Sequence, residues 1–141
     1  MEKELPVKDM IQTAFDMLKR SYTPYSHWKV GAGLLDADGK IWGGCNIENA
    51  AYTPCNCAER TAFFKAISEG QHSFTAIAVV GGHEGSVTDY CAPCGVCRQV
   101  MREFCDPKTF RIILAKSLNE YKVYTLEELL PESFGPSTMG M

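Results

Sequence analysis

Two short cysteine segments that lie far apart in the chain constrain its fold more than any other feature. The first is Cys57-Ala58-Glu59-Arg60, and the second runs from Pro93 to Gln99 and contains Cys94 and Cys97. Three of these thiols can bind one metal ion only if the fold brings both segments together. Three protein ligands leave the fourth position of a tetrahedral zinc ion open for water. A carboxylate outside the coordination shell, such as Glu59, can then carry protons, so the pattern favours a catalytic zinc site.

The predicted secondary structure places both segments at helix starts. Helices are expected over Ala58–Glu69, stopped by Gly70, and over Cys94–Phe104. Helix N-termini present unpaired amides and a partial positive charge, which favour the thiolate that binds metal. Cys94 and Cys97 are three residues apart and therefore lie on one face of a helical turn.

Two other interpretations of the cysteines remain open from spacing alone. Cys94 and Cys97 could form a redox pair, although such a pair does not need Cys-Ala-Glu at another helix start. Alternatively, Cys55 could join Cys57, Cys94 and Cys97 in a closed structural site with four cysteine ligands. Spacing does not show whether the fourth position of the metal is open.

The remaining pattern predicts an α/β fold. Apolar residues at helical spacing predict an amphipathic helix over residues 7–20, and Thr125 and Glu128 form a capping box that opens a short final helix. The expected strands are Val30–Leu35 and Ile41–Cys45, joined as a hairpin at Gly39, followed by Phe74–Val80, Phe110–Ala115 and Tyr121–Tyr124. Residues 46–54 and 81–92 are expected to be loops. Five strands with interspersed helices predict a three-layer α/β/α sandwich with a mixed five-stranded sheet, as a single domain over residues 1–141.

Composition excludes several classes of protein. The chain has 141 residues, 45% of them hydrophobic and 22% charged, as expected for a globular protein. No apolar run approaches the roughly 20 residues that span a bilayer, so no membrane partner is expected. The net charge of −3 argues against a nucleic-acid partner. Seven cysteines without a secretion signal indicate thiols and metal ligands in the reducing cytoplasm.

Beyond the zinc pattern, four motifs occur in order along the chain: Tyr25-Ser26-His27-Trp28-Lys29-Val30-Gly31-Ala32, Gly44-Cys45-Asn46-Ile47-Glu48-Asn49-Ala50-Ala51-Tyr52, Cys57-Ala58-Glu59-Arg60-Thr61-Ala62, and Pro93-Cys94-Gly95-Val96-Cys97-Arg98-Gln99. Through these motifs the chain resembles the cytidine deaminase family from about Tyr22 to Phe134. The short chain and the all-cysteine ligand set resemble the small homotetrameric branch, in which active sites are shared between subunits.

The resemblance implies one Zn²⁺ per chain, bound by Cys57, Cys94 and Cys97. It also implies that zinc-bound hydroxide attacks C4 of the pyrimidine while Glu59 carries the proton to N3. Three thiolates make the zinc centre formally negative, and the resemblance supports Arg60 as the side chain that offsets this charge. Arg98 either does the same or has a structural role.

Six further residues resemble the substrate contacts of the family. The expected contacts are Asn46 and Glu48 to the ribose 3′-hydroxyl, Ala58 through its backbone to the base, Trp28 beside the base, and Tyr52 and Phe134 to the substrate of a neighbouring subunit. Relatives often carry Phe where this chain has Trp28. Asn46 could instead be a turn residue, and the two aromatic residues Tyr52 and Phe134 could simply pack in the core.

The expected function is hydrolytic deamination of free cytidine and 2′-deoxycytidine to uridine and 2′-deoxyuridine plus ammonia, in pyrimidine salvage. Glu48 favours a nucleoside because a carboxylate bonds a hydroxyl and repels a phosphate. Deamination of an antibiotic nucleoside such as blasticidin S is an alternative within the same chemistry. Nucleic-acid editing is disfavoured by the acidic charge, and a non-catalytic zinc domain would need neither Glu59 nor the ribose-binding residues.

Overall fold

The first two strands form the predicted antiparallel hairpin. In the computed structural model, which describes residues 4–141, β1 (Trp28–Asp36) pairs with β2 (Ile41–Cys45). Gly39 adopts a φ of 92° in the turn, a conformation that glycine takes without steric cost. The buried Asp36 carboxylate closes the turn, because it accepts hydrogen bonds from the Asp38 amide at 2.8 Å, the Lys40 amide at 3.0 Å and the Trp42 indole at 2.9 Å.

Three more strands complete the predicted mixed sheet, whose strand order is β2-β1-β3-β4-β5. β3 (Phe74–His83) runs antiparallel to β1 and parallel to β4 (Arg111–Ala115), and β4 pairs antiparallel with β5 (Tyr121–Thr125). The expectation that the loop begins at Gly81 is wrong, since β3 continues to His83. Its last residues pair with the start of β1, and this ladder outweighs the low strand preference of Gly81 and Gly82.

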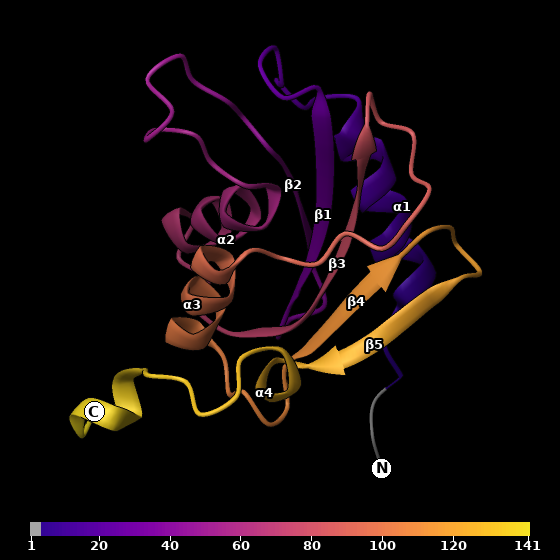
Figure 1. Cartoon of the computed structure of the whole chain (residues 1–141). Coiled ribbons are helices and arrows are strands. Elements are labelled where there is room, and N and C mark those ends of the chain that lie inside the picture. The colour runs from indigo at the N-terminus through magenta and orange to yellow at the C-terminus, as the bar shows by residue number, and fades with distance from the viewer. Residues whose placement is uncertain (1–3) are drawn as a thin grey trace.

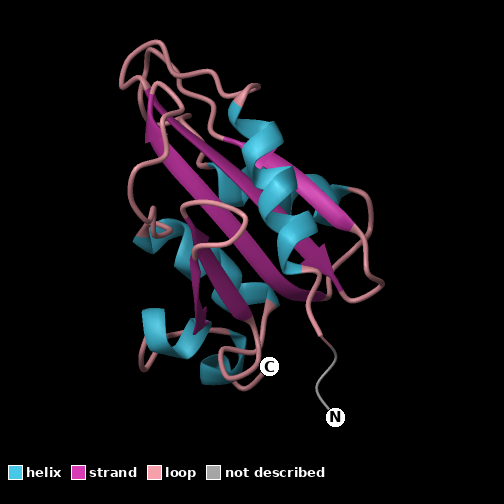
Figure 2. Cartoon of the chain, turned by 90° about the vertical axis from the view of Figure 1, so that its right-hand side faces the viewer, coloured by secondary structure: helices cyan, strands magenta, loops and turns pink. Residues whose placement is uncertain are grey.

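Helices cover both faces of the sheet and form the predicted sandwich (Figures 1 and 2). α1 (Val7–Leu18) packs on one face through Met10, Ile11 and Ala14. α2 (Ala58–Ser68) and α3 (Gly95–Phe104) lie on the other face. The side chains of β4 alternate between the two cores, as strand geometry requires: Ile113 belongs to the core under α1, and Ile112 to the core under α2 and α3.

The helix ends agree closely with the sequence. α2 stops before Gly70, which has a φ of 93°. The predicted capping box opens α4 (Leu126–Leu129), where the Thr125 hydroxyl accepts from the Glu128 amide at 3.2 Å. The final 3₁₀ turn η1 (Pro136–Met139) was not predicted, because four residues carry no readable apolar period. None of the helices within residues 4–141 is long and apolar enough to cross a membrane.

The start of α2 lies unusually close to β2. A β-carbon added to Gly44 would stand 2.3 Å from the carbonyl oxygen of Ala58 and 2.6 Å from the amide nitrogen of Ala62. Only glycine permits this approach of helix backbone to strand. The contact sets the height of the first turn of α2 above the sheet, and this turn carries Glu59 and follows directly after Cys57.

Candidate functional site

The fold brings the two cysteine segments together at the starts of α2 and α3. Cys57 and Cys94 are the residues that immediately precede these helices, and Cys97 lies in the first turn of α3. The Sγ atoms of Cys57 and Cys94 are 3.7 Å apart, and those of Cys94 and Cys97 are 3.5 Å apart. All three Sγ atoms lie within 4.8 Å of one another, the only such group of potential metal ligands in the described part of the chain.

These separations fit one zinc ion. Tetrahedral zinc with Zn–S bonds of about 2.3 Å places its sulfur ligands roughly 3.8 Å from one another. Cys55 does not join this group: its Sγ instead accepts a hydrogen bond from the Asn49 amide at 3.2 Å. The geometry therefore favours a three-thiolate site over the four-cysteine alternative.

The positively charged guanidinium of Arg60 lies beside the thiols. Its Nη2 lies 3.2 Å from the Cys57 sulfur. Hydrogen bonds from the Cys97 thiol and from Arg60 lower the pKa of Cys57 to about 5, in spite of the opposing effect of burial. Arg98 does not contact the sulfurs, since its guanidinium donates to the carbonyl oxygens of Pro93 at 2.8 Å and Leu129 at 2.6 Å. Of the two alternatives for Arg98, these contacts support the structural one.

Glu59 is buried in the first turn of α2, with only 3% of its surface exposed. Burial raises the pKa of Glu59 to about 7, and negative charge on Cys57 adds to the rise. A carboxyl group with a pKa near neutrality can both accept and donate a proton at physiological pH. The site thus places a potential proton carrier two residues from a potential metal ligand.

Asn46 and Glu48 follow β2; Asn46 is held by the start of β1, and Glu48 by the loop that precedes β1. The Asn46 side chain accepts from the Val30 amide at 2.9 Å and donates to the Trp28 carbonyl at 2.7 Å. The Glu48 carboxylate accepts from the Tyr25 amide at 3.0 Å, from the Ser26 amide at 3.1 Å and from the Ser26 hydroxyl. Burial acts to raise the pKa of Glu48, but these hydrogen bonds outweigh it and lower the pKa. Both side chains are therefore fixed in direction, and Glu48 is held ionised.

The aromatic residues predicted to contact substrate are exposed. Trp28 is 45% exposed, Tyr52 71% and Phe134 59%, so the alternative that Tyr52 and Phe134 pack in the core is wrong. Tyr52 has a φ of 63°, a strained conformation for a bulky residue, and its ring meets that of Tyr25 edge-on at 6.2 Å. Ala58, in contrast, is fully buried at the first position of α2.

Cys91 belongs to the site although its sequence context gave no sign of it. The Trp28 side chain hydrogen-bonds its thiol, and the thiol lies within electrostatic range of Glu59 and Cys57. Burial raises the pKa of Cys91, so the thiol stays protonated. The residue stands in the loop before Pro93, and only the tertiary contact with Trp28 reveals its position.

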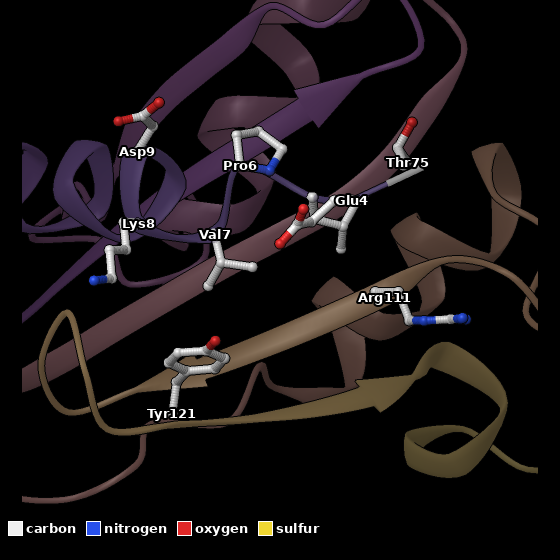
Figure 3. Close-up of a pocket in the computed structure, with 9 residues that line it drawn as sticks. Glu4, Pro6, Val7, Lys8, Asp9, Thr75, Arg111 and Tyr121 are labelled. Atoms are coloured by element: carbon white, nitrogen blue, oxygen red, sulfur yellow. The ribbon is translucent and has the colours of Figure 1, made fainter. Parts of the chain in front are cut away.

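A separate hollow of about 980 Å³ lies beside the start of α1 (Figure 3). It is lined by the start of α1 and by residues of β4 and β5, among them Pro6, Arg111 and Tyr121. Neither Glu59 nor any of the three clustered cysteines contributes to its wall. Its size is therefore unrelated to the chemistry of the cysteine cluster.

Comparison with known proteins identifies the family. A family model described as the cytidine and deoxycytidylate deaminase zinc-binding region matches residues 6–113, which include all three clustered cysteines. The chain belongs to the cytidine deaminase family. A curated cytidine deaminase from Sporosarcina psychrophila is 46% identical over 130 residues, which cover 92% of this chain and 92% of that protein. One from Halalkalibacterium halodurans is 43% identical and covers 99% of this chain and 98% of that protein.

A solved structure supports the same membership. The crystal structure of cytidine deaminase from Burkholderia pseudomallei matches with a TM-score of 0.80 at 44% identity, covering 89% of this chain and 97% of that chain. The predicted family and the predicted sandwich are thereby confirmed. The roles of individual residues in this cytidine deaminase family member stay predictions.

Proposed function

We propose that this protein catalyses the hydrolytic deamination of free cytidine and 2′-deoxycytidine to uridine and 2′-deoxyuridine, with release of ammonia. The observation that carries the proposal is the convergence of Cys57, Cys94 and Cys97 beside the buried carboxyl of Glu59. A redox pair or a purely structural zinc site has no need of this carboxyl. Membership in the cytidine deaminase family supports the same reaction.

The proposed cofactor is one Zn²⁺ per chain, held by the three thiolates. Zinc in such a site supplies Lewis-acid activation of water. Arg60, 3.2 Å from the Cys57 sulfur, reduces the negative charge that three thiolates would otherwise concentrate there. A less negative ligand set preserves the acidity that hydrolysis requires of the metal.

Glu59 is proposed to move the protons of the reaction. It takes a proton from the attacking water and delivers it to N3 of the pyrimidine, then takes the remaining proton of the new hydroxyl at C4 and passes it to the amine that leaves from C4. Its pKa of about 7 suits this exchange, because neither protonation state is strongly disfavoured near neutral pH. Because the Glu59 side chain is buried, bulk water does not compete for the proton that it carries.

Ribose recognition is proposed for Asn46 and Glu48, and their spare hydrogen-bonding capacity supports it. A carboxylate has about four lone-pair positions, and three at Glu48 are taken by Tyr25 and Ser26. One position is left for a sugar hydroxyl. Asn46 likewise keeps one donor hydrogen and one lone pair beyond its bonds to β1. The ionised Glu48 would repel a phosphate group, which favours nucleosides over nucleotides.

The base is proposed to lie between Trp28 and the backbone of Ala58. The Trp28 ring is exposed, and the backbone carbonyl of Trp28 accepts a hydrogen bond from the Asn46 side chain. Aromatic side chains stack well on a pyrimidine. The Cys91 thiol, which is hydrogen-bonded by Trp28, helps to orient this ring.

We further propose that the protein is a homotetramer with shared active sites, in which Tyr52 and Phe134 reach the substrate of a neighbouring subunit. The high exposure of both rings supports this arrangement. A cytoplasmic role in pyrimidine salvage is proposed from the free nucleoside substrates and from the seven unpaired cysteines, which suit a reducing compartment. Neither a membrane nor a nucleic acid is proposed as a partner.

The deciding experiment follows the ultraviolet absorbance of cytidine during incubation with purified, metal-analysed protein, with cytidine monophosphate in parallel. We expect zinc-dependent loss of cytidine and no loss of the monophosphate. If the protein holds one zinc per chain but deaminates neither cytidine nor cytidine monophosphate, the proposal that cytidine is the substrate is refuted, and blasticidin S would then be tested. Absence of zinc from active protein would refute the metal site itself.

A further inference from the structure

The second cysteine segment continues beyond its last thiol, and its polar side chains bind the C-terminal part of the chain. Gln99, two residues after Cys97, donates from Nε2 to the carbonyl oxygen of Phe134 at 2.8 Å. Arg98 reaches the carbonyl of Leu129 at 2.6 Å. The helix that follows Cys94 and contains Cys97 thus also holds the segment from Leu129 to Ser137, which passes by it in Figure 1.

Arg102 adds a second point of attachment one turn further along α3. Its Nε donates to the Ser133 hydroxyl at 2.8 Å, and its Nη2 donates to the Ser137 hydroxyl at 2.9 Å. Gly135 lies against the same guanidinium, since a β-carbon there would be only 2.4 Å from Nη1. The guanidinium therefore occupies the space that a side chain at position 135 would fill.

Phe134 is at the centre of these contacts, yet its ring is 59% exposed. The residues on both sides of it contact Arg102, and its own carbonyl is bound by Gln99. Single exposed apolar residues are common on protein surfaces. Holding a backbone segment in one conformation costs entropy, however, and here four hydrogen bonds hold the segment that presents an aromatic ring to solvent. Such an arrangement suits an aromatic ring that contacts a molecule outside its own subunit.

We propose that Gln99 and Arg102 are positioning residues that hold residues 133–137 so that the Phe134 ring contacts the nucleoside bound in a neighbouring subunit. This inference rests on the shared active site proposed above. It assigns a role to the end of the second cysteine segment that metal binding leaves unexplained. It also links two sites mechanically, because α3 carries the Cys97 thiol of one active site and the support for an aromatic wall of another.

The test is a double-mutant cycle on the zinc-loaded enzyme. Gln99→Met keeps the length of the side chain and removes its donor, and we expect kcat/KM for cytidine to fall about three- to tenfold, mostly through KM. Phe134→Ala should lower kcat/KM about ten- to a hundredfold, as expected for loss of a stacked ring. In the Phe134→Ala background, Gln99→Met should change kcat/KM less than about twofold, because the positioned ring is gone.

Two further variants separate positioning from general damage. Ser133→Ala combined with Ser137→Ala removes the acceptors of Arg102 but leaves its guanidinium in place, and it should raise KM in the same way. Glu103→Gln, on the same helix and exposed, is the matched control and should leave KM, kcat and zinc content unchanged. Additive effects of Gln99→Met and Phe134→Ala, or no effect of Gln99→Met alone, would overturn the inference while leaving the shared site intact. No effect of Phe134→Ala would instead overturn the shared site, and the inference with it.

Discussion

Replacing Gly44 by Ala tests whether the contact between β2 and α2 sets the geometry of the site. The added β-carbon would lie 2.3 Å from the carbonyl oxygen of Ala58 and 2.6 Å from the amide nitrogen of Ala62, where ordinary contacts begin near 3.4 Å. Both atoms belong to the helix backbone, so no rotamer change can relieve the overlap. The first turn of α2 must therefore retreat from the sheet by about 1 Å, and it takes Glu59 with it.

The size of the effect follows from this displacement. Overpacking costs typically about 1–3 kcal/mol, and a clash with fixed backbone belongs at the upper end of that range. For a chain of this length, a loss of about 3 kcal/mol lowers Tm by roughly 10 °C. A misplacement of about 1 Å in catalytic groups lowers the rate about a hundredfold. We expect both losses in Gly44→Ala.

Gly43→Ala is the matched control, since it is adjacent on the same strand but points to the other face. The added β-carbon would lie 2.8 Å from Sδ of Met17, and the Met17 side chain is flexible and can move aside. We expect a cost below about 1 kcal/mol and nearly full activity. Thermal unfolding and steady-state deamination of cytidine measure both variants. Wild-type Tm and kcat/KM in Gly44→Ala, or equal losses in the two variants, would refute the reasoning.

Three further predictions concern the catalytic carboxyl, the hairpin and the metal. Glu59→Ala should retain zinc but lose at least about a thousandfold in kcat, and full turnover would show that another group moves the proton. For Asp36, burial acts to raise the pKa, but hydrogen bonds from Trp42 and from backbone amides lower it overall. The ionised Asp36 carboxylate therefore stabilises the fold fully above the pKa that it has in the unfolded chain, and this stabilisation is lost as the pH falls through its pKa in the folded protein. Asp36→Asn should therefore lower the free energy of unfolding by about 1–3 kcal/mol at neutral pH. In urea titrations the difference between the two proteins should narrow as the pH falls below the ordinary pKa of an aspartate, and a difference independent of pH would contradict this assignment. Removal of zinc by a chelator should abolish deamination and expose the thiols of Cys57, Cys94 and Cys97 to titration, with recovery on adding zinc back, whereas activity in zinc-free protein would contradict the proposed chemistry.

Local patterns explain why so much of the fold was predictable. The amphipathic spacing of α1, the turn at Gly39 and the capping box at Thr125 are each specified by residues within a few positions of one another. The extension of β3 to His83 was missed for the opposite reason, because Gly81 and Gly82 form a strand only through their pairing with β1. A strand end supported by a distant partner leaves no local signal.

The same division applies to the site. By itself the sequence determined the donor types, their positions at helix starts and the family to which the chain belongs. Only the tertiary structure decided that Cys55 stays outside the cluster, that Arg98 and Gln99 bind the C-terminal segment, and that Phe134 is presented to solvent. Burial and distance depend on the packing of segments far apart in the chain, and residue spacing carries no record of that packing.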